Sequence, residues 1–307
     1  MTTAHPPSGD QHTIRFHDQV ATIVEVGGGI RSYAVGGRDV LHPYDIEAMC
    51  DGAHGTPLIP WPNRLADGKY VFDGAAQQVP LTEPGKGNAI HGLTRWRSWT
   101  AAERTDAAVT MAMTLRPSPG YPFALALRIR YALGDDGLSV RTTARNIGTH
   151  ECPYAHGQHP YLSPGRGSLD DCVLEFGAAT RIRTDSERQL PVGAVAVGRG
   201  TDYDFTGGRS LRGRLLDDAF TDLDRDGEGL ARVILRRPDG GRVRLWADSA
   251  FRYLQVYTAD TLAPARRRGG VAVEPMTAPS NAFASGEGVI RLAPGQTAET
   301  NWGVMLS

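Results

Sequence analysis

Cysteine is scarce in this sequence: its 307 residues include three, Cys50, Cys152 and Cys172. Their number is odd, their spacings are unrelated and no C-x-x-C pair occurs, which argues against a disulfide framework and a cysteine-ligated metal. A chain of this length can bury a sizeable core without such cross-links. We therefore expect reduced thiols in a cytoplasmic protein.

Long apolar runs are also absent. Runs such as residues 123–127 fall far short of the roughly 18–20 residues that a membrane span requires. Residues 1–10 are polar and lack the apolar segment of a secretory signal peptide. The sequence thus predicts no membrane partner.

An excess of charge of one sign is lacking too. Lys+Arg number 33 and Asp+Glu 34, which leaves a net charge of −1. This balance gives no electrostatic reason to expect nucleic acid as a partner. Lys69 and Lys86 are the only lysines, so arginine is the general cation of this chain. A cluster of arginines is therefore weak evidence for a binding site.

Glycine and proline, in contrast, are abundant and spread along the chain, with 37 and 20 residues, which predicts frequent turns. Short runs with β character lie between them, at residues 13–16, 21–26, 32–35, 109–115, 124–133, 138–146, 231–236, 242–247, 253–258, 271–274, 289–292 and 300–306. No window sustains the apolar spacing of an amphipathic helix over three turns. The pattern predicts an all-β fold, a large antiparallel sandwich or barrel.

The composition does not change abruptly along the chain, and we find no internal repeat. We therefore predict a single domain at residues 12–307 after a disordered tail at residues 1–11. Within this domain, Gly134-Asp135-Asp136-Gly137 is predicted to be the turn of a hairpin.

Two of the nine histidines stand in unusual surroundings. His91 lies in a segment, residues 87–92, whose glycines allow close backbone approach to a ligand. His159 stands among aromatic and proline residues, three positions after His156. A functional role and an ordinary core role are both open for each of them.

A metal site would need more than these imidazoles. His150, Glu151, His156 and His159 include plausible ligand types. However, the H-x-H pattern followed by glutamate that is common in metal-bearing β-barrels is absent. In an extended strand, moreover, His156 and His159 point to opposite faces. We therefore predict no metal.

Two acidic positions also stand out. Glu274 closes an apolar run just before Pro275, where a charge is costly unless it is hydrogen-bonded or functional. The alternative is a carboxylate at a strand end that reaches solvent. Asp217 and Asp218 lie side by side among apolar residues, and their alternative is a helix N-cap or a turn.

Trp61-Pro62-Asn63-Arg64 places a guanidinium beside an indole. Arginine offers several N–H donors to vicinal hydroxyls, and tryptophan stacks on the C–H face of a sugar ring. The alternative is a surface turn with a packed indole. Arg266-Arg267-Arg268 is predicted to be a solvated loop, with an anion-binding rim as the alternative.

Five segments of the chain have distinctive wording. They are P-L-I-P-W-P-N-R at 57–64 with D-G-K-Y and F-D-G shortly after it, G-N-A-I-H-G-L at 87–93, H-P-Y-L at 159–162, L-D-D-A-F at 216–220 and V-E-P-M-T-A-P-S-N-A-F at 273–283. Taken in order, they resemble motifs of the aldose 1-epimerase (galactose mutarotase-like) family, in its bacterial branch with W-P-N-R and E-P-M-T. Leu162 departs from the usual phenylalanine, and Asp218 from the usual histidine. The resemblance spans roughly residues 13 to 305 and implies a large antiparallel β-sandwich.

The resemblance also implies roles for single residues. Glu274 would be the base at the C1 hydroxyl and His159 the acid at the ring oxygen, kept partly protonated by nearby carboxylates. His91 and Arg64 would bind and polarise the ring oxygen and its neighbouring hydroxyls, and Arg64 would also stabilise negative charge as the ring opens. Sugar contacts would come from Asn63 and Arg64, from Asp217 or its neighbour Asp218, and from Trp61 or Trp96. No cofactor is expected.

Three functions follow as hypotheses. The first is a mutarotase for a neutral aldohexose, in a monomer or homodimer. The second is a 1-epimerase of an anionic hexose, such as a hexose 6-phosphate or sulfoquinovose, with Arg95, Arg97 or the arginines at 266–268 meeting the anion. The third is a non-catalytic sugar-binding protein, which the presence of both proton-transfer residues disfavours.

Overall fold

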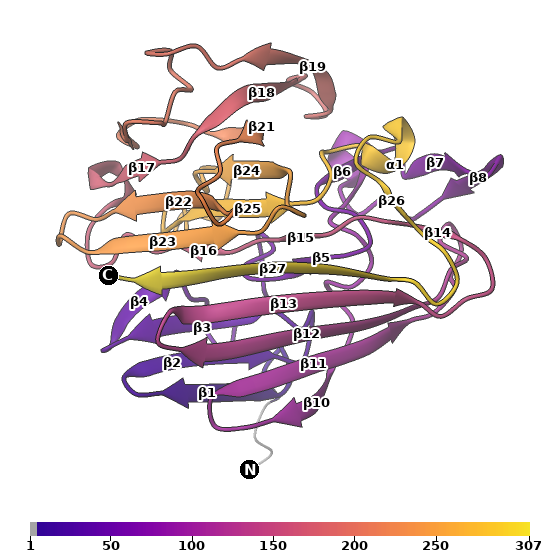
Figure 1. Ribbon diagram of the computed structural model, residues 1–307, viewed down its shortest axis with the longest axis horizontal. Helices are drawn as coiled ribbons and strands as arrows, with labels where there is room; N and C mark the ends of the chain where they lie inside the picture. The colour runs from indigo at the N-terminus through magenta and orange to yellow at the C-terminus, as the bar shows by residue number, and fades with distance from the viewer. Residues whose placement is uncertain (1–4) are drawn as a thin grey trace.

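A computed structural model describes residues 5–307, and its regular secondary structure consists almost entirely of strands (Figure 1). One sheet has twelve strands. Its main order is β1 (Gln11–Phe16), β2 (Gln19–Val24), β3 (Ile30–Val35), β4 (Arg38–Leu41), β16 (Tyr161–Leu162), β25 (Val271–Met276), β24 (Tyr253–Tyr257), β21 (Asp217–Leu223), β18 (Ala178–Thr184) and β19 (Pro191–Ala196), with β15 (Gly157–Gln158) pairing to β25 and to β5 (Pro57–Leu58).

The second sheet has nine strands. Its order is β10 (Thr100–Arg104), β11 (Ala108–Leu115), β12 (Leu125–Gly134), β13 (Gly137–Asn146), β27 (Thr297–Leu306), β23 (Arg242–Ala247), β22 (Ala231–Arg236), β17 (Val173–Glu175) and β20 (Arg209–Ser210). The remaining elements are three two-stranded pairs, one short α-helix and two 3₁₀ turns: β14 (Cys152–Tyr154) with β26 (Ile290–Leu292), β6 (Arg64–Ala66) with β9 (Asn88–Ile90), β7 (Lys69–Phe72) with β8 (Ala75–Gln78), α1 (Ala282–Ser285), η1 (Pro84–Lys86) and η2 (Leu169–Asp171).

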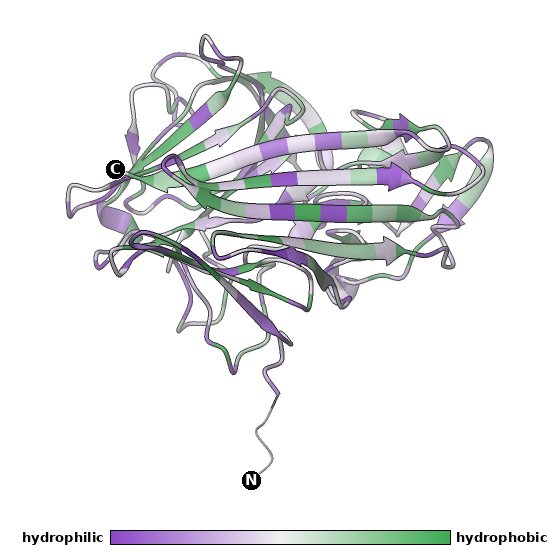
Figure 2. Ribbon diagram, turned by 60° about the horizontal axis from the view of Figure 1, so that its bottom comes forward, coloured by the Kyte–Doolittle hydropathy of each residue, from purple (hydrophilic) through white to green (hydrophobic). Residues whose placement is uncertain are grey.

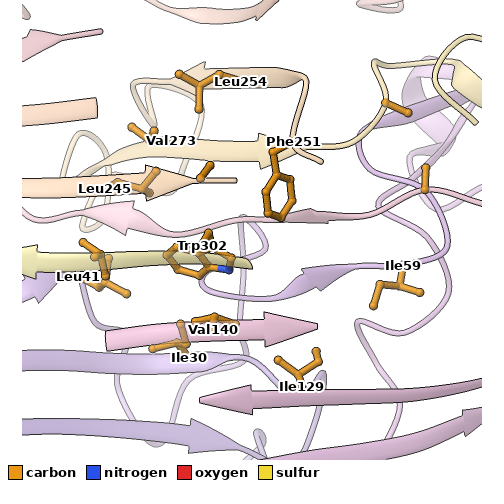
Figure 3. Close-up of a cluster of buried hydrophobic side chains, with 14 of the residues drawn as sticks. Ile30, Leu41, Ile59, Ile129, Val140, Leu245, Phe251, Leu254, Val273 and Trp302 are labelled. Atoms are coloured by element: carbon orange, nitrogen blue, oxygen red, sulfur yellow. The ribbon is translucent and has the colours of Figure 1, made fainter. Parts of the chain in front are cut away.

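The two large sheets pack face to face and enclose one main core. Ile30, Leu254 and Val273 of the twelve-stranded sheet meet Val140 and Trp302 of the nine-stranded sheet (Figure 3). Each fully buried side chain of this size contributes roughly 1.5–3 kcal/mol relative to an exposed one. The predicted antiparallel β-sandwich is confirmed.

Alternation along the strands explains this packing. In β12, Leu127 and Ile129 point into the core, whereas Arg128 and Arg130 between them are exposed. The resulting bands of hydrophobic and hydrophilic residues are visible along the nine-stranded sheet (Figure 2). The predicted hairpin turn is also present, because Gly134 pairs with Gly137 between β12 and β13.

The structure also bears on the predicted N-terminal tail, on the cysteines and on the absence of a membrane span. The ordered sheet begins at Gln11, and the Val26 N–H donates to the carbonyl of the buried Ser8, so chain packing begins inside the range predicted as a tail. Residues 1–4 of that tail lie outside the described residues. Cys50, Cys152 and Cys172 are free and buried. In the described part of the chain, we find no helix with the length and apolarity that crossing a membrane demands.

Candidate active site

A cavity of about 460 Å³ opens on the face of the twelve-stranded sheet that points away from the core. Its lining comes from widely separated parts of the chain: Gly52, Asn63, Arg64, Glu83, Lys86, Ile90, His91, Arg95, His159, Tyr161, Gln189, Asp217, Tyr257, Thr261, Leu262 and Glu274. The cavity therefore contains every residue to which the sequence assigned proton transfer.

Strand register explains why these side chains meet. In the ladder, Glu274 of β25 lies opposite Gln255 of β24, and Tyr257 lies opposite Asp217 of β21. Because side chains alternate along a strand, Val273 and Val256 enter the core while their neighbours face the cavity. Glu274, whose buried charge the sequence predicted to be costly, thus lies on an inner strand of the sheet, where the neighbouring strands fix its position.

His159 and Glu274 form a buried pair at the floor of the cavity. His159 Nε2 lies 3.2 Å from Glu274 Oε1, and both residues are less than 5% exposed. Glu274 Oε2 and His159 Nδ1 have no hydrogen-bond partner among the described residues. The backbone of His159 is fixed on both sides, since its N–H donates to Thr56 and its carbonyl accepts from Gly55.

Burial acts on the protonation of this pair. It raises the pKa of Glu274 well above its ordinary value, and the nearby Asp217 carboxylate adds to the rise. Burial likewise lowers the pKa of His159 well below its ordinary value. This differs from the expectation that carboxylates keep His159 protonated, because desolvation and the nearby His54 and Arg95 favour the neutral ring. One proton shared by the pair is the form that avoids two buried charges.

His91 is held as a neutral ring beside this pair. Its Nδ1 accepts the Asn63 N–H at 3.2 Å, so Nε2 carries the proton when burial, as here, lowers the pKa of the ring. The His91 and His159 rings stand nearly perpendicular, with centroids 5.3 Å apart. The adjacent Gly92 is required by the protein itself rather than by a ligand, because a Cβ there would lie 2.0 Å from the carbonyl oxygen of Ile59.

Arg64 lines the cavity, but its charge is already balanced. Its Nε and one Nη donate to the two carboxylate oxygens of Glu83, at 2.9 and 3.1 Å. Its other Nη lies 3.9 Å from Asp217. The sequence did not single out Glu83, which stands 19 residues after Arg64 in a polar turn.

The structure separates Asp217 from Asp218. Asp217 faces the cavity and accepts from the amides of Gln189 and Gln255, each at 2.6 Å. Asp218 points to the other face, 3.3 Å from the guanidinium of Arg181. Both belong to β21, so the alternative of a helix N-cap or turn is wrong.

Neither tryptophan lies in the cavity. Trp61 is buried in the main core, where its indole packs against Phe283 with ring centroids 5.4 Å apart. Trp96 is exposed outside the cavity, under the guanidinium of Arg95. The aromatic rings that do line the cavity are those of Tyr161 and Tyr257.

The far wall of the cavity comes from the turn between β18 and β19. Gln189 at its tip donates to Asp217 and accepts from Lys86. Arg188 anchors the turn by donating to the carbonyls of Lys86 and Gly87, at 2.9 and 2.6 Å. No pattern in the sequence indicates that Gln189 reaches this site.

We expect Gln189→Ala to raise KM for the sugar about tenfold while kcat changes less than twofold. The substitution removes two hydrogen bonds to charged groups, those with Asp217 and Lys86, each worth roughly 1.5–3 kcal/mol, at the end remote from His159 and Glu274. Glu187→Ala, in an exposed position of the same turn, is the matched control. A fall in kcat at unchanged KM would contradict this assignment.

The predicted arginine-rich loop does not line the cavity. Arg266 pairs with Asp51 at 2.5 Å, and Arg268 pairs with Asp260 and Asp170 at 2.9 and 2.7 Å. Two of the three arginines of this loop are therefore already paired with carboxylates of the protein.

The four candidate metal ligands are not brought together. His156 bonds to Thr300 and Glu151 to Arg291, away from the His159–Glu274 pair. Across residues 5–307, no cluster of three or more His, Cys, Asp or Glu side chains has the arrangement to hold a metal ion.

Comparison with solved structures places this architecture. A galactose mutarotase-like protein from Clostridium acetobutylicum superposes with a TM-score of 0.84 at 19% identity, over 96% of this chain and 94% of the other. Galactose 1-epimerase from Lactobacillus acidophilus superposes with a TM-score of 0.79 at 16% identity, over 97% and 94% of the two chains. At these identities the likeness shows the fold alone. The molecule is a galactose mutarotase-like sandwich.

The chain belongs to the aldose 1-epimerase family, whose sequence model matches residues 10–302. It is also similar to the uncharacterized protein YihR of Escherichia coli (strain K12), with 35% identity over 291 residues, which cover 94% of this chain and 91% of YihR. A probable aldose 1-epimerase from Arthroderma benhamiae is 23% identical over 168 residues, which cover 48% of this chain and 38% of that protein.

Proposed function

We propose that this protein is an aldose 1-epimerase that interconverts the α and β anomers of a neutral aldohexose. The observation that carries the proposal is the His159–Glu274 pair, an acid and a base 3.2 Å apart at the floor of a sugar-sized cavity. In a cyclic aldose the C1 hydroxyl and the ring oxygen are bonded to the same carbon. The two proton-transfer sites of the substrate are therefore neighbours, as the two protein groups are.

The proposed reaction needs one proton on the pair. In the reacting form the shared proton lies on His159 and Glu274 is ionised. Glu274 then takes the proton of the C1 hydroxyl while His159 gives its proton to the ring oxygen, and the ring opens to the aldehyde. Rotation about C1–C2 and closure on the other face complete the exchange. Each positioned group contributes roughly 10²–10⁴-fold to the rate. In this proposal the Nε2–H of His91 donates to the ring oxygen or a neighbouring hydroxyl.

Hydrogen-bonding groups at the far end suit a neutral sugar. Asp217 keeps lone pairs for hydroxyl donors, and Gln189 and Lys86 stand beside it. The cations there are balanced by Glu83 and Asp217. Arg266 and Arg268 pair with carboxylates outside the cavity, and Arg95 lies near His91 and His159 instead of at this end. We therefore favour the neutral aldohexose over a hexose 6-phosphate or sulfoquinovose.

Polarimetry on freshly dissolved single anomers tests this proposal. Glucose, galactose, glucose 6-phosphate and sulfoquinovose are compared, with the spontaneous rate subtracted. The expected result is acceleration, with kcat/KM highest for a neutral hexose. A tenfold preference for an anion that weakens at raised salt would contradict the neutral substrate. Sugar binding with no acceleration would support the non-catalytic alternative instead.

We also expect activity to survive EDTA unchanged, because the proposed proton transfers use side chains alone. Thermal melting recorded on the same samples separates lost catalysis from lost stability. Activity that falls with EDTA and returns with a divalent ion would contradict the mechanism.

A further inference from the structure

Arg95 differs from the other cations of the cavity. Its guanidinium lines the cavity wall, in the turn that follows His91, yet it has neither a hydrogen bond nor an ion pair with any residue of the described chain. Its Nε is buried without a partner. Its recorded contact is with a ring, since the guanidinium carbon lies 5.3 Å from the centroid of Trp96.

Arg64 and Lys86, in contrast, are balanced inside the cavity. Both lie within 4 Å of Glu83, and Arg64 also approaches Asp217. The lining holds three cations (Arg64, Lys86, Arg95) and three carboxylates (Glu83, Asp217, Glu274). Two of each kind offset one another at the far end. Near His159, Glu274 pairs with the imidazole, and Arg95 remains as the unmatched cation.

A half-buried cation without a partner is costly, because burial removes part of its hydration and no protein group replaces it. Burial indeed lowers the pKa of Arg95. The simplest reason for such a cation is that a negative charge pairs with it during the reaction. The proposed reaction produces a negative charge on the sugar. With one proton on the His159–Glu274 pair, the lining carries a net charge of +1. When Glu274 takes the proton of the C1 hydroxyl and His159 has not yet released its own, this net charge rises to +2.

The electrons account for where that negative charge goes. The electron pair of the O1–H bond moves to form the C1=O1 carbonyl, and the C1–O5 bond breaks with its pair going to O5. His159 supplies the proton that O5 takes up. Until that transfer is complete, negative charge lies on O1 and O5 of the sugar.

We propose that Arg95 is a catalytic residue that binds this developing negative charge on the sugar oxygens, the role that family resemblance gives to Arg64. The proposal rests on the proposed epimerase function. Arg64 is less suited to the role, because a bidentate carboxylate already occupies its guanidinium. Preorganised donors aimed at a developing oxyanion are worth roughly 10²–10³ in kcat.

A permanent anionic group on the sugar would satisfy the same guanidinium, so the experiment separates the two sources of charge. Arg95→Met, Arg95→Lys and Arg97→Met are assayed with glucose and glucose 6-phosphate. Arg97 is the matched control, an exposed arginine of the same turn that does not line the cavity. Melting temperatures are measured for every variant.

For glucose, Arg95→Met is expected to lower kcat about 10²-fold or more with KM within about threefold, whereas Arg95→Lys keeps at least a tenth of the rate. Arg95→Met should melt no lower than the wild type, since the lost charge is unpaired. Arg97→Met should match the wild type in both measurements.

Three results would overturn the proposal. One is an unchanged kcat in Arg95→Met. Another is a loss confined to KM for glucose 6-phosphate, which would assign Arg95 to a permanent anion. The third is a loss that lysine does not rescue and that follows a lower melting temperature, which would make Arg95 structural. A wild-type protein inactive on every sugar would instead refute the proposed function.

Discussion

Replacing Glu274 by glutamine is expected to lower the rate of anomer interconversion by about 10³-fold while sugar binding is largely kept. The amide retains the shape of the carboxyl group and can still bond to His159, but it cannot take the proton of the C1 hydroxyl. Polarimetry gives the rate, and calorimetric titration with the sugar gives the affinity. Wild-type kcat in this variant would show that Glu274 is structural.

The same variant should be more stable than the wild type, increasingly so as pH rises. The pKa of Glu274 is raised in the folded state, so its contribution to stability is complete below the unfolded pKa near 4.5 and is lost as pH rises toward the folded value. Glutamine does not ionise and escapes this loss. We expect a melting temperature higher by about 2 °C or more at pH 8 and no such gain at pH 4. A variant that melts lower at both pH values would contradict this account of the buried carboxyl.

His159→Asn is expected to have an effect of similar size, lowering kcat by about 10²–10⁴-fold. The substitution removes the group that gives a proton to the ring oxygen and leaves the neighbouring wall intact. Single-turnover polarimetry with one anomer measures the loss. KM should change little, because the hydroxyl contacts lie at the Asp217 end of the cavity.

His156→Asn is the matched comparison, three residues away. His156 is buried between the sheets, where Nδ1 bonds to the hydroxyl of Thr300 at 2.9 Å and the ring packs near Phe251. Burial lowers its pKa to about 3, so it is neutral throughout the working range. We expect this variant to lose stability, roughly 1–3 kcal/mol, and to keep its kcat. Equal losses of kcat at both histidines would favour a shared network over a single acid.

Alternation and glycine turns made the central strands predictable. The apolar side of β12 and the turn at Gly134–Gly137 follow from local sequence, because each strand buries one face against the opposite sheet. The region from β17 to β21 was not predicted as strands. Most of β19 is exposed, with no buried face to impose a period of two.

The residues of the candidate site also fall into those that could be predicted from local sequence and those that could not. Glu274 and His159 could be singled out, since a carboxylate in an apolar strand and a histidine among aromatic residues are locally unusual. Gln189 could not, because its place depends on how a distant turn docks on Lys86 and Asp217. Trp61 was misassigned because sequence alone does not tell which side of a segment enters the core.

The turn that carries Gln189 lies at the edge of the large sheet, whereas Glu274 lies on an inner strand with paired neighbours on both sides. Backbone amides of β25 should therefore exchange with deuterium only through global unfolding, and those of the turn through local opening. The proposed proton-transfer pair and the turn that carries Gln189 therefore differ in rigidity. Substitutions in the turn can therefore alter the proposed sugar specificity with little loss of stability. Substitutions at the proton-transfer pair, in contrast, also affect the packing of the central strands.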